Sequence, residues 1–486
     1  MRVFLLASVA ACVLGGSAAA ETLHDALAAA YQSNPELEAQ RAALRATDEG
    51  VATALSGYRP TLEGQASISY SRRDSQFFAT EDIPERDPVT NEVVRDSNGN
   101  PVIAIPKGGQ ITSSTLQGQN RQYQAQLTQP IFRGFRTQSG LRQARSEVFA
   151  GRAQLDEVEQ RTLLNTITAY LDVVRDEAVL RLNDGQVEVL RRQLEASQDR
   201  FRVGEITRTD VAQSEARLAV AVSNRIAADA ALTVSREAFR RVVGKAPETL
   251  EPPPPLPELP ASLEEAIAIA QEESPTLNAA RHVEEAAQYA VSSAKGALLP
   301  SLNATASVFR QEAPFNFGTF NANGTINNYA AGAQLTVPFY RAGGEYAAVR
   351  QAKQVRSQRM LEIAAAERQV VESVRNAWDQ LRAARASIKS NQSSMRANEI
   401  ALEGVRQEAV VGSRTTIEVL NAEQELLNSR VELVRSERDE YVAASTLLAA
   451  IGRLGARDLS LNVDYYDPGD HYRSVKWKPF GFGSNE

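Results

Sequence analysis

Two short stretches decide the fold of this chain: Val203-Gly204-Glu205-Ile206-Thr207 and Val411-Gly412-Ser413-Arg414-Thr415. In each, a glycine is placed to end one helix and a threonine to cap the next. Helical patterns flank both turns, over residues 137–202 and 208–243 and over residues 345–410 and 416–451. At 1.5 Å per residue, the longer helix of each pair extends roughly 100 Å. Heptad spacing of apolar residues predicts coiled-coil packing between neighbouring helices.

The chain is an internal repeat. Residues 23–67 align without gaps on residues 263–307 at an offset of 240, and later segments align at an offset of 208. The change of 32 residues identifies an insertion in the first half, between residues 70 and 123. We expect a first repeat over 21–250, a proline-rich connector over 251–261, a second repeat over 262–452 and a tail over 453–486.

Each repeat also contains a strand hairpin, over residues 61–130 and 301–340. The alternation of side chains has period 2 and is bounded by Pro60, Pro130, Pro300 and Pro338, which mark the junctions between strand and helix. One face carries uncharged amides and hydroxyls, and the other carries small, aliphatic and aromatic side chains. A water-filled lumen opposite lipid fits this pattern. A soluble sheet with one wet face fits the alternation equally well.

Four strands are too few for a transmembrane barrel, because single-chain barrels begin at eight. A barrel therefore requires an oligomer. Two copies would supply eight strands and three copies twelve, and the strands alone do not choose between them.

The first 20 residues predict export: Arg2 precedes an apolar run, and three alanines precede Glu21. Cleavage after Ala20 would remove Cys12, the one cysteine, and leave no thiol chemistry. The alternative is a lipoprotein signal with Cys12 lipidated. The formal net charge of −7 argues against nucleic acid as a partner. We find no internal apolar run of 18 residues, which argues against an inner-membrane helical transporter.

The sequence predicts neither an enzyme nor a cofactor or metal site. The three histidines are widely separated, and no protease, hydrolase or nucleotide-binding motif occurs. Asp96 begins a calcium-like loop, but Pro101 and Lys107 occupy the positions that need glycine and glutamate, so we expect a plain turn. Tyr170 and Trp378 occupy equivalent repeat positions, where we expect helix packing.

Several motifs at the junctions between strands and helices, taken together, indicate a family. They are Gln129-Pro130-Ile131-Phe132-Arg133-Gly134, Leu299-Pro300-Ser301-Leu302, Val337-Pro338-Phe339-Tyr340, and the turn at 411–415 followed by Glu418-Val419-Leu420-Asn421-Ala422-Glu423. Their order, spacing and twofold repetition over residues 22–455 resemble the TolC-like outer membrane factors, most closely the type I secretion members. The resemblance implies an α+β membrane protein. It would be a homotrimer whose 12-stranded β-barrel, four strands per chain, continues into a long α-helical periplasmic tunnel.

The function that the resemblance implies is a passive exit duct in the outer membrane of a Gram-negative bacterium. It would serve type I secreted proteins, multidrug efflux or both. Its partners would be a periplasmic adaptor and an inner-membrane ABC or proton-driven exporter. A periplasmic coiled-coil adaptor or scaffold without a channel is the alternative, although adaptors carry one helical hairpin and compact β-domains.

The resemblance also implies which residues form functional sites. The tip that docks the adaptor would contain residues from both turns: Gly204, Thr207, Gly412, Arg414 and Thr415. A periplasmic gate of inward-facing acids would lie shortly before the second turn, at Glu403 or Glu399. Arg406 departs from the family pattern, because the best-known members carry an acid there. Good turns without a docking role and an ordinary charged helix face are the alternatives.

Overall fold

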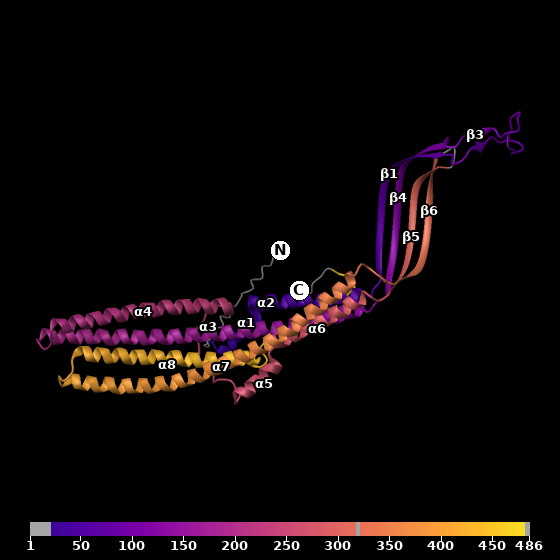
Figure 1. Ribbon diagram of the computed structural model, residues 1–486. Helices are drawn as coiled ribbons and strands as arrows, with labels where there is room; N and C mark the ends of the chain where they lie inside the picture. The colour runs from indigo at the N-terminus through magenta and orange to yellow at the C-terminus, as the bar shows by residue number, and fades with distance from the viewer. Residues whose placement is uncertain (1–20, 317–320, 482–486) are drawn as a thin grey trace, which may run out of the picture. The chain divides into compact units, whose positions relative to one another are not determined.

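The two repeats form the same series of elements in the computed structural model, which describes residues 21–316 and 321–481 (Figure 1). The first repeat contains α1 (Leu23–Ser33), α2 (Pro35–Ser56), β1 (Thr61–Phe78), β4 (Gln110–Arg133), α3 (Arg136–Arg202) and α4 (Arg208–Val243). The second contains α5 (Leu263–Glu273), α6 (Pro275–Gly296), β5 (Ser301–Asn316), β6 (Asn321–Thr336), α7 (Gly344–Val410) and α8 (Thr416–Ile451). The expected signal peptide lies outside the described residues.

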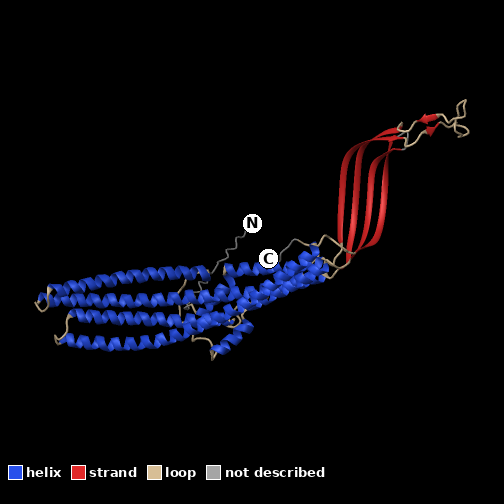
Figure 2. Cartoon of the chain, in the orientation of Figure 1, coloured by secondary structure: helices blue, strands red, loops and turns tan. Residues whose placement is uncertain are grey.

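Equivalent helices of the two repeats have equal lengths. Helices α3 and α7 each contain 67 residues, and α4 and α8 each contain 36. The chain divides into two compact units. We call Thr53–Leu141 with Ala290–Gln351 the sheet unit, and the remaining described residues the helical unit. The expected class, long helical hairpins with four principal strands per chain, is confirmed (Figure 2).

The four long strands form one antiparallel sheet in the order β1-β4-β5-β6. Its central pair, β4 and β5, joins the two repeats, with Ala125 opposite Val308. Along β4, Gln122 and Gln124 are half-buried, whereas Tyr123 and Ala125 are exposed. In this part of β4 the two faces therefore differ in environment as well as in polarity, whereas nearly all of β1 is exposed on both faces.

The insertion in the first repeat forms a small structure of its own. Strands β2 (Ile83–Pro84) and β3 (Ile103–Ile105) pair with each other, and two further bridges lie between them in the chain. At the calcium-like stretch, Asp96 Oδ1 accepts hydrogen bonds from the backbone N–H groups of Asn98 (2.9 Å) and Asn100 (2.8 Å). Gly99 completes this turn with a φ of 81°. The carboxylate of Asp96 is thus engaged in the turn itself.

The junctions between strand and helix depend on proline and glycine. Pro130 lies where the β4–β5 register shifts, at a position where a missing N–H is tolerated. Gly134 has a φ of 60°, and a Cβ built there would lie 2.2 Å from the carbonyl oxygen of Gly296. A Cβ on Gly296 would lie equally close to the Gly134 carbonyl oxygen. The two junction backbones therefore touch, and only glycine fits at their crossing.

The core of the helical unit surrounds Tyr170, whose side chain is fully buried. Its hydroxyl donates to the carbonyl oxygens of Glu21 (2.9 Å) and Glu251 (2.7 Å). It therefore ties the start of the first repeat to the connector between repeats. Trp378 is partly buried against the same cluster, so both aromatic residues pack as the sequence indicated.

The C-terminal tail completes this core. Leu454 and Leu461 are buried in it, and the backbone N–H of Tyr466 donates to the Tyr31 hydroxyl (3.1 Å). The guanidinium of Arg41 lies between the rings of Tyr31 and Tyr466, 4.6 and 5.1 Å from their centroids. A short helix, α9 (Asp470–Val475), follows.

Among the residues that the structure describes, one helix is long and apolar enough, by length and composition alone, to cross a membrane: α4. Such a single match is weak evidence. In the structure α4 pairs with α3 through Arg225–Asp184 (2.7 Å) and Arg236–Glu177 (2.9 Å). These contacts identify α4 as half of a coiled-coil hairpin.

The glycine crossing is testable with Gly134→Ala. The left-handed backbone costs a residue with a Cβ about 1–2 kcal/mol, and the clash with the Gly296 carbonyl cannot be relieved by a side-chain rotation. We expect a lower thermal unfolding midpoint for the purified protein in detergent. Gly140→Ala is the control, because a Cβ at Gly140 has no atom within 4 Å. An unchanged midpoint in Gly134→Ala would contradict the contact.

Candidate functional site

The turns at the ends of the two helical hairpins have matching geometry. Gly204 and Gly412 have φ values of 78° and 80°, the left-handed conformation that glycine adopts without strain. The backbone N–H groups that follow return to the preceding helix, from Glu205 to Arg200 O and from Ser413 to Glu408 O. Both glycines therefore end their helices as the sequence indicated.

Each turn is followed by a threonine cap. Thr207 Oγ1 accepts the backbone N–H of Asp210 (3.3 Å), and Asp210 Oδ2 accepts that of Thr207 (2.9 Å), which forms a capping box. In the second turn, the backbone N–H of Thr415 donates to Glu418 Oε2 (2.8 Å). That bond, together with Arg414, holds the pKa of Glu418 below its usual value. The caps fix the direction in which α4 and α8 start.

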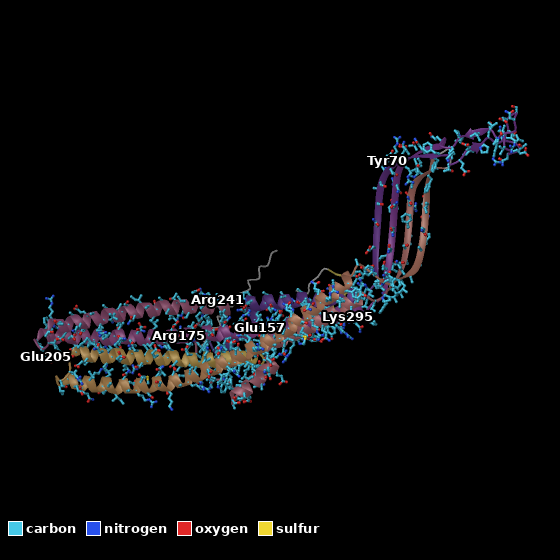
Figure 3. All side chains as sticks on the ribbon, in the orientation of Figure 1. Tyr70, Glu157, Arg175, Glu205, Arg241 and Lys295 are labelled. Atoms are coloured by element: carbon cyan, nitrogen blue, oxygen red, sulfur yellow. The ribbon has the colours of Figure 1, made fainter. Side chains whose placement is uncertain are left out.

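Ion pairs brace both turns from the outside. Arg414 Nε donates to Glu408 Oε2 (2.7 Å) and its Nη1 to Glu418 Oε1 (3.0 Å), so that one guanidinium spans the turn. Arg200 Nη2 donates to Glu205 Oε1 (2.6 Å) at the other turn, where Figure 3 labels Glu205. This bond lowers the pKa of the Glu205 carboxyl. The side chain of Arg414 thus stabilises its own turn.

Exposed valines accompany the glycines, and sequence reasoning did not single them out. Val203 and Val411, at equivalent repeat positions, are each 78% exposed, and Val410 is 88% exposed. A Cβ added to Gly204 or Gly412 would meet no atom within 4 Å. The two tips therefore present apolar side chains beside open backbone.

The structure separates the residues considered for the gate. Glu399 accepts from Arg430 Nη2 (2.9 Å), and Arg406 Nη2 donates to the buried Glu423 (2.8 Å), so both join α7 to α8. Glu403 is exposed and accepts only from Gln407, one turn along α7 (2.8 Å). Within the described part of the chain, Glu403 forms no ion pair.

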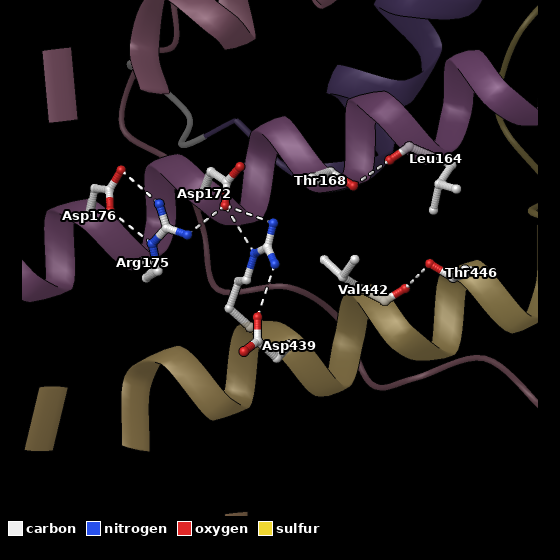
Figure 4. Close-up of polar contacts among 9 residues, drawn as sticks. Leu164, Thr168, Asp172, Arg175, Asp176, Asp439, Val442 and Thr446 are labelled. Carbon is white, nitrogen blue, oxygen red and sulfur yellow. Dashed lines mark hydrogen bonds and ion pairs between the residues drawn. The ribbon is translucent and has the colours of Figure 1, made fainter. Parts of the chain in front are cut away.

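A charge network joins α3 to α8 farther from the tip (Figure 4). Asp172 Oδ1 accepts from Arg175 Nη1 (2.8 Å) and from Arg438 Nε (2.9 Å). Arg175 also donates to Asp176, and this bond raises the pKa of the Arg175 guanidinium. Arg438 in turn donates to Asp439 (2.9 Å). The network fixes one hairpin against the other.

One face of the sheet carries an apolar band. Along β5, Leu302 to Val308 present aliphatic side chains on alternate positions, and Arg310 is the first charge. The eight-residue step from Leu302 to Arg310 covers about 27 Å along the strand, which at the strand tilt of outer-membrane barrels is a height of roughly 20 Å, somewhat less than their apolar band of about 25 Å. Exposed Tyr123, opposite Arg310, lies where an interfacial aromatic residue is expected.

Metal-ligating side chains are not grouped in residues 21–316 and 321–481: no three of His, Cys, Asp or Glu are placed to hold an ion. The candidate functional features are the turns at the ends of the helical hairpins, the edge strands of the sheet and the packed helical hairpins, which are surfaces suited to contacts with other chains or with lipid.

Comparisons with known proteins match this architecture. The outer membrane efflux protein family matches residues 26–245 and 266–453. The outer membrane efflux protein BepC of Brucella suis is 35% identical over 470 residues, covering 96% of this chain and 94% of BepC. The outer membrane protein TolC of Escherichia coli is 26% identical, covering 90% and 84%. The CmeC outer membrane channel of Campylobacter jejuni superposes with a TM-score of 0.70 at 15% identity, covering 94% and 89%.

Proposed function

Because the chain belongs to the outer membrane efflux protein family, whose members are outer membrane channels of tripartite export systems and not enzymes, we propose that three copies form one passive exit duct. The resemblance to TolC-like factors is confirmed by the family match. It locates the chain in the outer membrane of a Gram-negative bacterium, with the helical unit in the periplasm. The adaptor alternative is discarded, because the match includes both repeats with their strands.

The unpaired edge strands of the sheet support the proposal of a trimer. In the order β1-β4-β5-β6, strands β1 and β6 each have one side without a partner among the described strands. Lipid cannot hydrogen-bond these backbone groups, so an open edge in the membrane is unstable. Pairing β6 of one copy with β1 of the next closes the sheet, and three copies supply the twelve strands that the family resemblance implies.

Helix α7 supports the same assembly. Only five of its 67 residues are buried within the single chain, whereas α8 buries 13 of 36. Large apolar side chains such as Leu361 and Ile400 are about three-quarters exposed on α7. Large apolar side chains left exposed on a helix of this length indicate contact with another surface. A neighbouring copy provides it in a closed ring.

The two tips would bind the periplasmic adaptor. Exposed Val203, Val410 and Val411 offer apolar contacts, and the open space over Gly204 and Gly412 lets a partner approach the backbone. Thr207, Thr415 and Arg414 hold this surface in shape rather than contacting the adaptor first. An inner-membrane ABC or proton-driven exporter, reached through the adaptor, would supply the energy.

The cargo would be type I secreted proteins, drugs or both. Efflux is the function in the name of BepC, and the second turn and the tail resemble family members that serve type I secretion. A duct shared by two exporters accounts for both likenesses. The wall of such a duct needs no binding site of its own.

The gate would be formed by Glu403. Three copies facing one narrow axis would repel one another and attract cations. Glu399 is less suited to this role, because Arg430 neutralises it within its own hairpin.

Assembly is tested by Leu361→Asp, which would bury an unpaired carboxylate between two copies. We expect a lower trimer fraction, measured by light scattering of the protein in detergent. Leu361→Met, which keeps the apolar contact, should assemble like the wild type. A Leu361→Asp variant that remains fully trimeric would contradict the contact between copies at α7.

Docking and export are tested together by Gly412→Leu, which strains the turn by about 1–2 kcal/mol and fills the space that the adaptor needs. We expect a normal trimer but loss of adaptor cross-linking, with loss of drug resistance, of protein secretion, or of both. The control is Gly185→Leu, at an exposed glycine of α3 with open space around it. Full export through Gly412→Leu would rule out docking at this turn.

Single-channel recording tests the gate. Glu403→Ala should reduce cation selectivity and weaken the block by trivalent cations, because the ring of negative charge is removed. Glu399→Ala is the matched control and should have the smaller effect. If Glu403→Ala conducts like the wild type while Glu399→Ala does not, the gate lies at Glu399; if neither changes, it lies elsewhere.

A further inference from the structure

The end of the C-terminal tail is attached to the helical unit by a buried charge pair. His471, on α9, places its Nδ1 3.4 Å from Asp48 Oδ2, on α2. The side chain of Asp48 is 0% exposed and that of His471 is 13% exposed. Neither oxygen of Asp48 accepts a well-formed hydrogen bond within the described residues. His471 is therefore the group in ion-pair contact with a carboxylate that has no access to water.

The charges that face this pair come from each neighbouring element. Helix α2 also contributes Glu49, whose Oε1 lies 3.9 Å from His471 Nε2. Helix α3 contributes Arg152, which attracts Asp48 and whose guanidinium lies over the ring of Tyr472 at 5.8 Å. On the tail itself, Arg473 pairs with Asp467 and Asp470. Two acids of α2 thus meet one permanent cation and one histidine.

The protonation of this pair decides how well it tolerates burial. A buried carboxylate without a compensating charge is unfavourable, whereas a paired one is tolerated. Burial raises the pKa of Asp48, and His471 and Arg152 oppose that rise. A protonated His471 beside Asp48 therefore lowers the cost of burying that carboxylate, whereas a neutral imidazole does not. Stabilisation that depends on the imidazolium is present at lower pH and is lost as the pH rises.

We propose that His471 and Asp48 form a proton-dependent latch, which holds the end of the C-terminal tail on the helical unit and releases it as the pH rises. When His471 is protonated, it neutralises Asp48 across the interface between tail and α2. When His471 loses its proton, Asp48 remains buried with Arg152 alone, and the docked state is weakened. Histidine is suited to this role because it titrates between about pH 5 and 8.

The latch controls only the last part of the tail. The earlier part is fastened independently of His471, because Arg453 makes two bonds of 2.7 Å to Glu273 and Leu461 is buried in the core. Beyond α9, Trp477 and Phe480 are exposed. Release would therefore free residues from about Asp467 onward, including both aromatic side chains, without unfolding the helical unit.

A spin label on the tail measures this equilibrium. We would label Ser474→Cys, an exposed position on α9, in the full chain carrying Cys12→Ser, and record label mobility between pH 5.5 and 8.5. We expect mobility to increase reversibly with pH. The ratio of docked to free tail changes by up to about tenfold for each unit of pKa difference between the docked and free pair. A mobility that does not change over this range would overturn the proposal.

Two variants distinguish the latch from general loosening. His471→Gln should abolish the pH dependence. Asp48→Asn should weaken it strongly, because no buried carboxylate then depends on the charge of His471, and only the exposed Glu49 still faces the imidazolium. Asp48→Asn behaving like the wild type, or His471→Gln keeping the transition, would refute the assignment.

His282→Gln is the matched control. His282 lies 3.4 Å from Glu285, the same distance as in the latch, but both side chains of this pair are partly open to water and lie within one helix. It should keep the wild-type transition. Circular dichroism and light scattering of each variant verify that the helices and the assembly are intact. Equal effects of His282→Gln and His471→Gln would show that the response is not specific to the latch, and would overturn it.

Discussion

Unpaired backbone groups at the edges of the sheet are the constraint on which the rest of this structure depends. Water can satisfy the free edges of β1 and β6, but lipid cannot. The chain must therefore find other copies of itself before its strands are stable in a membrane. A ring of copies also brings the long hairpins together, so closing the barrel and building the tunnel are one event. The small number of buried residues on α7 in a single chain agrees with a helix that packs against a neighbouring copy in that ring.

Duplication supplies matching elements but not matching environments. Tyr170 and Trp378 occupy equivalent positions on α3 and α7, yet Tyr170 is fully buried and Trp378 only partly. The difference arises because the chain start at Glu21 and the connector at Glu251 cover Tyr170, whereas Trp378 packs against the core cluster with part of its side chain exposed. Contact between repeats is tightest at Gly134 and Gly296, where two backbones touch. The helices of the two repeats therefore have equal lengths, but different parts of the chain pack against them.

Local patterns in the sequence were sufficient to predict the helices, the long strands and the two turns. The period of the side chains predicted helices and strands, and the glycine–threonine spacing predicted both turns, because a left-handed residue and a cap act within a few neighbours. Contacts between segments that are distant in the sequence could not be predicted from these local patterns. The hydrogen bond between Asp172 and Arg438 joins residues 266 positions apart, and the ion-pair contact between Asp48 and His471 joins the first repeat to the tail. The small sheet in the insertion was missed for a different reason, because its strands are too short for a periodic signal.

Polar contacts are distributed unevenly between the hairpins. Within each hairpin, side-chain bonds recur along its length, such as Arg225–Asp184 in the first and Arg406–Glu423 in the second. Between the hairpins near the tip, Arg217 Nη2 donates to Asn421 (2.6 Å), and Leu420 packs in a small cluster with residues of α3 and α4. The Asp172–Arg438 network holds the hairpins together farther along. Separating the hairpins at the tip therefore breaks fewer of these side-chain hydrogen bonds and ion pairs than splitting either hairpin.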